Sequence, residues 1–485
     1  TGEPFTAAPP PEGEGEVDLR PLIVGSEGTF GFITRATMRV WPAPVAWEGV
    51  ACTFRSMRDA WGAIRAIYQT GLRPAVSRLY DPFDTWLFLQ GSEKHSPRST
   101  DRPSPGRPRP ALEALLRHAL DHPQPLNALA HFVGDELYGR SLLILVFERS
   151  DREGDVAPIE RAKGLCRASG GEDAGDAPWR RWLVRRHAVS DRQPPTYTKG
   201  VWVDTMEVAS PWSRLGDLYD NVRAALGEGG FVMAHMSHAY PDGCSIYFTF
   251  AGASPTDAQA LERYDAVWRR ALKAAHESGG TIAHHHGVGR HKRSAMGLEW
   301  GAGVRWLEAL RRAADPGGVM VRGALVSDTD EVVGVTPETA ENVKVDVPSR
   351  LVTTRPGVSL TTLRDALAKE GFSLGATGEA DTVREWLAQH ATSTHDPVDH
   401  VVAGWTARLP SGGRGGWLPC PRRSTGPDVF PLVLRDARFG TLESVTVRVR
   451  GDDEGGPAWV APCDAPATVK DTALAAWIDR AAREV

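Results

Sequence analysis

The chain has little cysteine and no long apolar run, and both absences narrow the classes of protein to which it can belong. Its 485 residues include 5 cysteines, which are scattered, odd in number and without a C-x-x-C pair. A disulfide framework and a cysteine-based zinc site are therefore not expected, whereas a reducing compartment is. No apolar stretch approaches the length of a membrane span. We expect a cytoplasmic protein.

Concentrated basic charge is also missing. Lysine and arginine number 56 against 61 aspartates and glutamates, which gives a formal net charge of −5. Nucleic-acid binding needs a concentrated basic surface, so no nucleic-acid partner is expected.

The first residue is Thr rather than Met and no signal peptide is visible, so we expect a fragment or a processed form. The length predicts two to three domains, each large enough for its own core.

Glycine is concentrated in one informative stretch, residues 25–34. Three glycines with one acid and hydroxyl side chains form a predicted loop that runs into a predicted strand over residues 35–40. Such a loop lets the backbone approach a ligand closely, and its N–H groups can hold phosphate or ring acceptors. Glycine-rich turns before strands are common, so the pattern by itself is only weak evidence for a cofactor site.

The middle of the chain alternates strand and helix patterns. Strands are predicted over residues 50–54, 76–80, 141–147, 201–208, 231–239 and 245–250, and helices over 57–70, 159–168, 212–226, 255–278 and 301–314. Two strand–helix–strand cycles of this kind predict an antiparallel sheet with helices packed on one face. Residues 91–110 hold 5 prolines and are predicted to be a disordered excursion.

A run of three histidines, His284, His285 and His286, lies between glycines and has three interpretations. Metal ligation is disfavoured because neighbours in an extended segment point to opposite faces, and no carboxylate or thiolate stands at ligand spacing nearby. A solvated or tag-like loop is the second interpretation. Acid–base or substrate-orienting work is preferred, because imidazole changes charge near neutral pH. No metal is therefore expected.

Two further side chains stand near predicted strand ends. Tyr247 lies on alternating positions of a hairpin pattern, where an amphipathic core aromatic with a satisfied hydroxyl is the plain interpretation. Arg78 ends a strand, and a lone arginine there is more often a surface ion-pair partner than a ligand clamp. Neither residue identifies a function by itself.

Taken together, these segments resemble a known family. Residues 20–325 resemble the FAD-linked oxidases of the vanillyl-alcohol oxidase and p-cresol methylhydroxylase (PCMH) type, and within them alkyldihydroxyacetonephosphate synthase and its bacterial relatives. The motifs that carry the resemblance are Gly25-Ser26-Glu27-Gly28-Thr29, Arg78-Leu79-Tyr80-Asp81, Val203-Asp204-Thr205-Met206-Glu207, Tyr247-Phe248 and Ala283-His284-His285-His286-Gly287-Val288-Gly289.

The resemblance implies a cofactor, a reaction and a site. It implies FAD and alkyl-for-acyl exchange through a flavin N5 adduct, in ether lipid synthesis. Tyr247 matches the tyrosine that handles a proton on the substrate carbon, and His284, His285 and His286 match catalytic histidines. The implied cofactor-binding residues are Gly25, Ser26, Glu27, Gly28, Thr29, Gly31 and Ile33.

The resemblance also implies two arginines that hold an oxyanion, because a rigid guanidinium fork suits that shape. Arg78 matches the first. Gln193 aligns with the second, and Arg192 stands one place earlier, so Arg192 is the candidate for the second contact. The Asn-Pro-Gly-Lys turn of relatives is replaced here by residues 321–324.

The resemblance predicts the fold class and domain boundaries. We expect an α+β protein in which residues 1–45 end a PCMH-type FAD-binding domain and residues 46–330 form an α/β cap with an antiparallel sheet. Residues 331–485 echo the first segment: residues 427–434 repeat the shape of residues 17–24. Arg435-Asp436-Ala437-Arg438 stands where the first copy has Gly25-Ser26-Glu27-Gly28, so the third unit is expected to be a degenerate FAD-binding-like module that binds no flavin.

Three functions stay open at this stage. The first is the synthase-like exchange, and the second is an FAD-dependent dehydrogenase for a 2-hydroxy acid such as D-lactate or glycolate, with a histidine base and an arginine clamp. The third is a non-catalytic or truncated flavoprotein relative. The expected partner is a small-molecule or lipid substrate, and the resemblance allows a homodimer and peripheral contact with a membrane surface.

Overall fold

The computed structural model describes most of the chain in separate ranges. These are residues 4–6, 20–38, 40, 42–90, 118–132, 140–149, 156–186, 201–320, 324–326, 342–374, 380–390, 401–451 and 472–485. The predicted disordered excursion at residues 91–110 and the predicted oxyanion contact Arg192 lie outside the described residues.

The larger of the two main sheets, called the central sheet below, has seven strands in the order β4-β1-β3-β2-β6-β7-β5. Its strands are β1 (Ala46–Phe54), β2 (Val76–Tyr80), β3 (Ser141–Arg149), β4 (Glu172–Asp173), β5 (Val201–Pro211), β6 (Phe231–Ala239) and β7 (Gly243–Ala253). Every neighbouring pair is antiparallel. The predicted antiparallel sheet is therefore confirmed.

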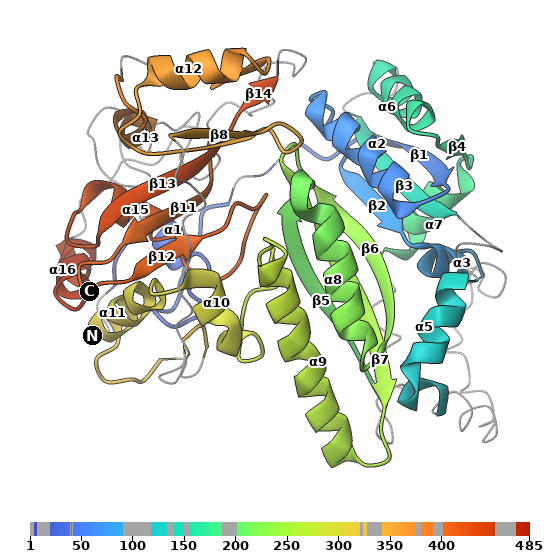
Figure 1. Ribbon diagram of the computed structural model, residues 1–485, viewed down its shortest axis with the longest axis horizontal. Helices are drawn as coiled ribbons and strands as arrows, with labels where there is room; N and C mark the ends of the chain where they lie inside the picture. The colour runs from blue at the N-terminus through green and yellow to red at the C-terminus, as the bar shows by residue number, and fades with distance from the viewer. Residues whose placement is uncertain are drawn as a thin grey trace.

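Helices cover this sheet on both faces, so the prediction of helices on one face alone was wrong. On one face lie α2 (Met57–Gln69), α6 (Ala157–Ala168), α8 (Leu215–Gly227) and α9 (Asp257–Glu277) (Figure 1). Apolar side chains of the opposite face at β1, β2 and β3 instead form a second core with Trp179 of α7 (Ala177–Arg185). β3 is apolar at successive positions because both of its faces are buried, as in Leu142 and Leu143.

A five-stranded antiparallel sheet, β12-β11-β13-β9-β8, forms the C-terminal part. Its strands are β8 (Val343–Asp346), β9 (Leu351–Thr354), β11 (Val402–Arg408), β12 (Arg414–Trp417) and β13 (Thr441–Arg448), and β10 (Phe372–Ser373) pairs with β14 (Arg450–Gly451). The helices of this part are α12 (Leu360–Ala368), α13 (Val383–His390), α15 (Phe430–Arg435) and α16 (Thr472–Ala482). Helices with antiparallel sheets confirm the α+β class.

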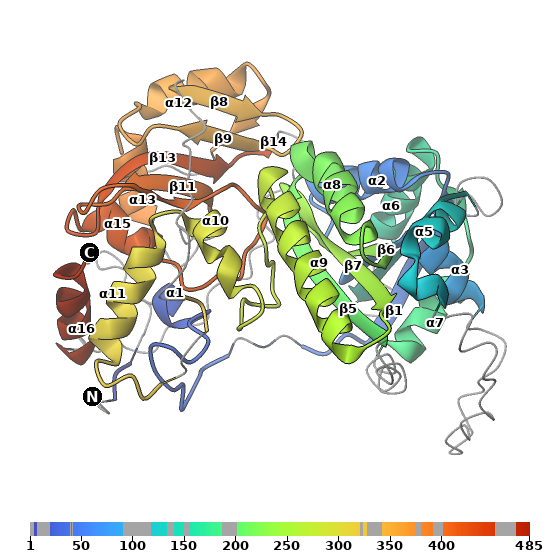
Figure 2. The ribbon, with the colours of Figure 1, turned by 60° about the horizontal axis from the view of Figure 1, so that its bottom comes forward.

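The remaining helices lie outside these two groups: α1 (Arg20–Ile23), α3 (Pro82–Gln90), α5 (Pro123–Phe132), α10 (Met296–Trp300) and α11 (Val304–Ala314), with the short 3-10 turns Trp212–Arg214 and Arg293–Ala295. In both views, α11 and α16 lie side by side with α10 next to the C-terminal sheet, so α10 and α11 join the two sheets (Figures 1 and 2). The Nε1–H of Trp300 donates to the carbonyl of Thr425 at 2.6 Å.

The strand predicted over residues 35–40 is not formed in the described part of that range, and this prediction was wrong. Residues 31–38 have no regular structure, and the side chains of Phe32 and Met38 are 84% and 76% exposed. An apolar alternation forms a strand only when a neighbouring strand pairs with it, and residues 31–38 pair with no strand that the structure describes.

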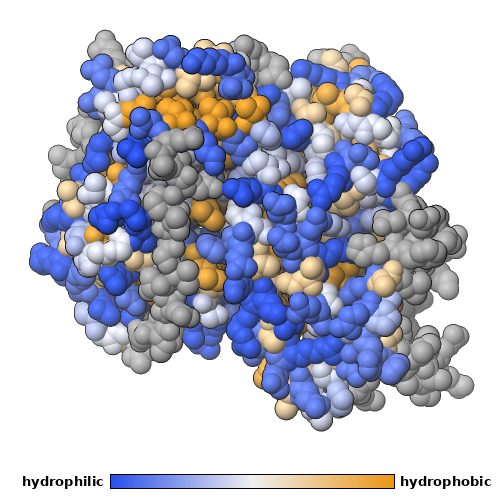
Figure 3. Space-filling model, viewed as in Figure 1, coloured by the Kyte–Doolittle hydropathy of each residue, from blue (hydrophilic) through white to orange (hydrophobic). Residues whose placement is uncertain are grey.

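The surface is mainly hydrophilic on the face viewed in Figure 1, with apolar side chains gathered below α12 (Figure 3). Val343 and Val345 of β8 are partly buried there against the C-terminal core. Within the described residues, no helix combines the length and apolar character that crossing a bilayer requires.

Candidate functional site

The polar groups of the central sheet lie in one row across its strands. Tyr80 of β2 pairs with His235 of β6, His235 pairs with Tyr247 of β7, and Tyr247 pairs with Glu207 of β5. Neighbouring positions such as Phe248 point instead into the core beneath α8 and α9. Cross-strand register therefore brings together residues from four strands that are far apart in the sequence.

An irregularity between Met236 and Ala239 of β6 changes this pattern at the strand end. It places His238 beside the row: the His238 ring lies 4.8 Å from the His285 ring and 6.2 Å from the Tyr247 ring, between centroids. The turn that follows carries Tyr240, whose N–H donates to the carbonyl of Gly243 at 2.8 Å. Bulges of this kind commonly re-aim side chains next to functional sites.

The histidine run follows α9 and bends over the row. Gly279 ends the helix with φ +76°, and Thr281 then forms an isolated bridge with Ala209 of β5. The carboxylate of Glu299 accepts from the Thr281 hydroxyl at 2.6 Å, and the ammonium of Lys292 donates to the carbonyl of Ile282 at 2.8 Å. These buried contacts fix the segment immediately before His284.

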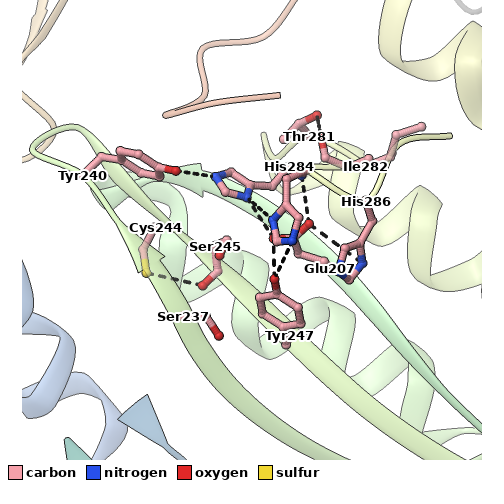
Figure 4. A network of polar contacts seen from close by, with 12 residues as sticks. Glu207, Ser237, Tyr240, Cys244, Ser245, Tyr247, Thr281, Ile282, His284 and His286 are labelled. Atoms are coloured by element: carbon pink, nitrogen blue, oxygen red, sulfur yellow. Dashed lines mark hydrogen bonds and ion pairs between the residues drawn. The ribbon is translucent and has the colours of Figure 1, made fainter. Parts of the chain in front are cut away.

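Glu207 is the centre of the polar network (Figure 4). One of its oxygens, Oε1, lies 2.8 Å from Nδ1 of His284 and 2.8 Å from Nδ1 of His285. The other, Oε2, accepts the backbone N–H of His285 at 3.0 Å. The Tyr247 hydroxyl lies 3.1 Å from Nε2 of His285, and the Tyr240 hydroxyl lies 2.9 Å from Nε2 of His284. Two phenols are thus joined through two imidazoles and one carboxylate.

Burial and charge shift the pKa values of this network. Burial alone raises the pKa of Glu207, but the hydrogen bond and charge of His284 and the N–H of His285 lower it to about 2. Burial, with the charge of Glu207, raises the pKa of Tyr247. Burial raises the pKa of Tyr240 to about 12. The carboxylate is therefore ionised and both phenols are neutral at neutral pH.

A second group of polar residues lies on the other side of Tyr247. The His235 ring stacks on Tyr247 with 4.9 Å between centroids and 10° between planes, and Nδ1 of His235 lies 3.3 Å from the carboxylate of Asp84. Burial lowers the pKa of His235. Arg78 lies on the adjacent row, where one terminal N–H donates to the Ser237 hydroxyl at 2.7 Å.

The glycine loop at residues 25–29 lies against the end of the histidine segment. The Glu27 carboxylate accepts the N–H groups of Val288 and Gly289, both at 2.7 Å. Ser26 and Thr29 are buried, and the Thr29 hydroxyl donates to the Ser26 carbonyl at 2.6 Å. The loop thus contacts the predicted catalytic segment directly.

The other predicted cofactor residues have different surroundings. Gly25 and Gly28 adopt φ +83° and +76°, whereas Gly31 has open space around it. Ile33 is 60% exposed. The structure therefore brings the loop at residues 25–29 to the site and leaves Gly31 and Ile33 in the exposed segment that follows. Their role in binding a cofactor stays a prediction.

Two premises of the argument against a metal were wrong. Nδ1 of His284 and Nδ1 of His285 lie 3.1 Å apart, although neighbours in an extended strand point to opposite faces. The segment bends here and is not a strand, so the two-residue period does not apply. A carboxylate is also present, because Glu207, 77 residues before His284, is in contact with it.

Sequence reasoning gave Glu207, Tyr240 and His238 no role of their own in the site. Glu207 stands in a strand of otherwise largely apolar neighbours, where 0% of its surface is exposed. A charged residue in such a strand is a signal for a buried partner. The identity of that partner depends on the register of β5 against β7, which the sequence alone does not give.

Comparison with known proteins identifies the central part of the chain. The family model described as FAD linked oxidases, C-terminal domain, matches residues 45–325. The alkyldihydroxyacetonephosphate synthase of Trypanosoma brucei brucei is 24% identical over 318 residues, which cover 64% of this chain and 48% of the relative. The mitochondrial cytochrome-type D-lactate dehydrogenase of Arabidopsis thaliana is 22% identical over 312 residues, covering 64% and 47%.

A solved alkyldihydroxyacetonephosphate synthase has a TM-score of 0.39 and 20% identity, over 60% of this chain and 46% of that one. The chain spans about half the length of the curated relatives it matches.

Proposed function

Because the chain belongs to the FAD-linked oxidase family through that family's C-terminal domain, we propose that its central sheet forms the substrate half of a flavoenzyme. The proposed reaction exchanges an acyl group for an alkyl group on a dihydroxyacetone phosphate ester. The bond from the substrate carbon to the carboxylate oxygen breaks and a fatty acid leaves. A fatty alcohol then bonds to that carbon through its oxygen and gives up its proton, so that there is no net oxidation. The name of the trypanosome relative supports this substrate class.

FAD is the cofactor of this family, and the donor groups of the site fit it. Among the described residues, the buried Nε of Arg78 and the buried hydroxyl of Ser245 lack a hydrogen-bond partner. Both lie on the sheet face that carries Tyr247, and buried donors of this kind need an acceptor. The carbonyl and ring-nitrogen acceptors of an isoalloxazine, or the oxygens of a substrate, would satisfy them. When bound, FAD supplies an electron-accepting ring next to the substrate carbon.

The observation that carries the proposal is the contact between Tyr247 and His285. A neutral phenol becomes a base only when its own proton has an acceptor, and Nε2 of His285 stands 3.1 Å from the hydroxyl. The ionised carboxylate of Glu207 lies at the other nitrogen of that ring, where it orients the ring and stabilises positive charge. Tyr247 would take a proton from the substrate carbon and return it once the new ether bond has formed.

Arg78 would hold the anionic part of the substrate in this proposal. Its guanidinium lies 5.6 Å from the centroid of the Tyr80 ring, two residues along the same strand, so Arg78 faces the side of the sheet that carries Tyr247. A planar fork of donors suits a phosphate or a carboxylate. The proposed second contact, Arg192, remains a prediction from the sequence.

The test uses the full 485-residue chain with added FAD, acyl-dihydroxyacetone phosphate and an isotope-labelled fatty alcohol. We expect label in the ether product, free fatty acid in equal amount, and no lasting loss of flavin absorbance. A folded protein that binds FAD but gives no labelled ether would contradict the proposal. A folded but colourless protein that also gives no ether would favour the non-catalytic alternative.

A second candidate is an FAD-dependent 2-hydroxy-acid dehydrogenase. The stacked pair of His235 and Tyr247, together with Arg78, supplies a base and a cation for a hydroxy acid, and one relative is a D-lactate dehydrogenase. This candidate predicts bleaching of the flavin absorbance when D-lactate or glycolate is added without oxygen. Bleaching without ether formation would therefore replace the first proposal with the second.

A further inference from the structure

Three atoms of the types that ligate metals lie close together in Glu207, His284 and His285. Oε1 of Glu207, Nδ1 of His284 and Nδ1 of His285 form a triangle with edges of 2.8, 2.8 and 3.1 Å. In a tetrahedral zinc site with ligands at about 2.0–2.2 Å, neighbouring ligand atoms lie about 3.3–3.6 Å apart. The triangle is thus only slightly smaller than one face of such a site.

A fourth ligand stands beside this triangle. His238 completes a group of four residues whose ligand atoms all lie within 4.8 Å of one another. Nδ1 of His238 is buried and, among the described residues, lacks a hydrogen-bond partner. A buried imidazole nitrogen without a partner is uncommon, and it lies next to three atoms that are already grouped. Three imidazoles with one carboxylate are a donor set that suits Zn²⁺.

We propose that Glu207, His238, His284 and His285 form a Zn²⁺ site, and that occupancy of this site switches off the proton exchange between Tyr247 and His285. The ion binds to Nδ1 of each of the three histidines and to Glu207. The site needs His238 to close by about 1–1.5 Å, which a side-chain rotation supplies.

Zinc binding leaves one proton on each of the His284 and His285 rings and changes only the nitrogen that carries it. In the network as it stands, Nδ1 of His284 is hydrogen-bonded to the carboxylate, which can only accept, so Nδ1 carries the proton and Nε2 faces the Tyr240 phenol. Nδ1 of His285 lies 2.8 Å from the same carboxylate, and the Tyr247 hydroxyl lies 3.1 Å from Nε2 and 3.4 Å from Nδ1 of that ring. When the ion binds Nδ1 of both rings, the proton of each ring is on Nε2, and Nε2–H donates to the phenol oxygen. Donation by the second nitrogen of a ligating histidine is the usual supporting contact of zinc sites.

Tyr247 is affected because Nε2 of His285 changes from a hydrogen-bond acceptor to a donor when zinc binds. Nε2 of His285 accepts the phenol proton only while it carries none of its own, so the zinc-bound form has no acceptor for it. The inference goes beyond the proposed reaction, because zinc binding itself requires neither flavin nor substrate. Its direct test therefore stays valid if the proposed reaction fails.

The test is a titration of the chelator-treated full chain with Co²⁺ and with Zn²⁺, without FAD or substrate. We expect one Co²⁺ per chain, with the intense visible absorption of a four-coordinate ion, and displacement of that absorption by Zn²⁺. A weak octahedral-type spectrum, or no saturable binding, would overturn the site. A folded-state check by circular dichroism accompanies each variant.

Variants make the assignment specific. His238→Ala removes the unpartnered ligand and breaks none of the hydrogen bonds described above around Glu207, and we expect a loss of Zn²⁺ affinity greater than about 100-fold. Tyr240→Phe removes only the supporting acceptor of His284, and we expect a loss of about 10- to 100-fold. His291→Ala is the matched control: this imidazole packs on Trp268, 4.6 Å away, and its loss is expected to leave affinity unchanged. Equal affinities of His238→Ala and the unmodified chain would refute the four-ligand site.

Inhibition is measured in a separate step, with whichever substrate proves active. Zn²⁺ at a concentration that saturates the Co²⁺ site is expected to stop turnover of the unmodified chain, and His238→Ala is expected to need far more Zn²⁺. Full turnover by a chain with one Zn²⁺ bound would overturn the switch and leave only the metal site.

Discussion

Glu207 is the side chain on which the other polar groups of the central sheet depend. It is fully buried, yet its carboxylate contacts two imidazoles and one backbone N–H. A buried charge is costly unless it is paired and hydrogen-bonded, so these contacts are what makes an ionised carboxylate possible at this depth. The same contacts hold the His285 ring beside Tyr247, whose hydroxyl lies 3.1 Å from Nε2 and 3.4 Å from Nδ1.

Replacing this carboxylate by an amide tests that dependence. In Glu207→Gln the shape is kept but one oxygen becomes an NH₂ group, which faces N–H donors and leaves buried groups unpaired. We expect the free energy of unfolding, measured with urea, to fall by about 1–3 kcal/mol. The matched control is Glu48→Gln in β1: Glu48 is 41% exposed and bonds Arg149, so the expected loss is below about 1 kcal/mol. Equal losses would show that Glu207 is not the centre of the network.

Removing the phenol oxygen of Tyr247 tests the catalytic proposal at the same scale. Tyr247→Phe keeps the ring that stacks on His235 and removes only the group that contacts His285. We expect ether formation to fall by about 10²- to 10⁴-fold, the usual contribution of a positioned acid–base group, with FAD affinity unchanged. Tyr264→Phe is the control, because its hydroxyl bonds Asp204 near α9, on the other face of the sheet. Similar rates for Tyr247→Phe and the control would remove Tyr247 from the mechanism.

At the scale of elements, the positions of helices and strands were predictable from the sequence, but the pairing of one strand with another was not. The residues of β6 were predicted as they stand, and α2 within one residue, because two-residue and helical periods are local signals. The segment at residues 35–40 has the same alternation as a strand but remains irregular where it is described. Whether residues 35–40 form a strand depends on a neighbouring strand with which they can pair, and a local pattern gives no information about that neighbour.

In the site, too, residues in local motifs were predictable, whereas contacts that depend on strand pairing were not. Tyr247 and the histidine run were proposed from a motif, and the structure brings them within 3.1 Å of one another. Glu207 belonged to a quoted motif but had no predicted role, because its contact with His284 depends on β5 register and on the bend after Gly279. The two segments of the predicted internal echo each contain a short helix, α1 and α15, and the N–H of Asp428 donates to the carbonyl of Pro21 at 2.9 Å. The echo itself stays a prediction.

The glycine loop offers a test at this scale. Gly25 has φ +83°, and a Cβ there would lie 2.9 Å from the carbonyl oxygen of Gly426. Gly25→Ala is therefore strained both in its backbone and in its contact, and we expect the free energy of unfolding to fall by about 1–3 kcal/mol. Gly31→Ala is the control, because a Cβ there meets nothing within 4 Å. Thermal unfolding compares the two, and an equally stable Gly25→Ala would show that the loop does not press on residue 426.

At the scale of the whole molecule, the two sheets are joined by contacts that reach the site. The N–H of Ser424 donates to the carbonyl of Ala283 at 2.8 Å, one residue before the histidine run. The guanidinium of Arg448 in β13 donates to the Asp242 carboxylate at 2.9 Å and to the carbonyl of Pro421 at 2.7 Å. Asp242 is buried in the turn that follows Tyr240. The C-terminal sheet therefore supports the geometry of the site, whatever its own binding properties.

Arg448→Met tests this coupling. It keeps apolar length, removes the charge and leaves Asp242 buried without its cation, so we expect the free energy of unfolding to fall by about 2–4 kcal/mol. Arg408→Met is the matched control in the neighbouring strand β11, because Arg408 is 53% exposed and its bond to Glu443 is a surface ion pair. Its expected loss is below about 1 kcal/mol.

The form of the unfolding curve distinguishes coupling from simple loss of stability. Trp300 of α10 and Trp417 of β12 lie 5.4 Å apart between ring centroids, so tryptophan fluorescence, to which all 16 tryptophans contribute, includes a signal from the junction between the two sheets. If the sheets support each other, fluorescence and far-ultraviolet circular dichroism change together in one transition for the unmodified chain. In Arg448→Met the fluorescence transition is expected to move to lower denaturant first and so to separate from the other. Two separate transitions in the unmodified chain would instead show that the sheets unfold independently, and Arg448 would then have no route by which to affect Tyr247.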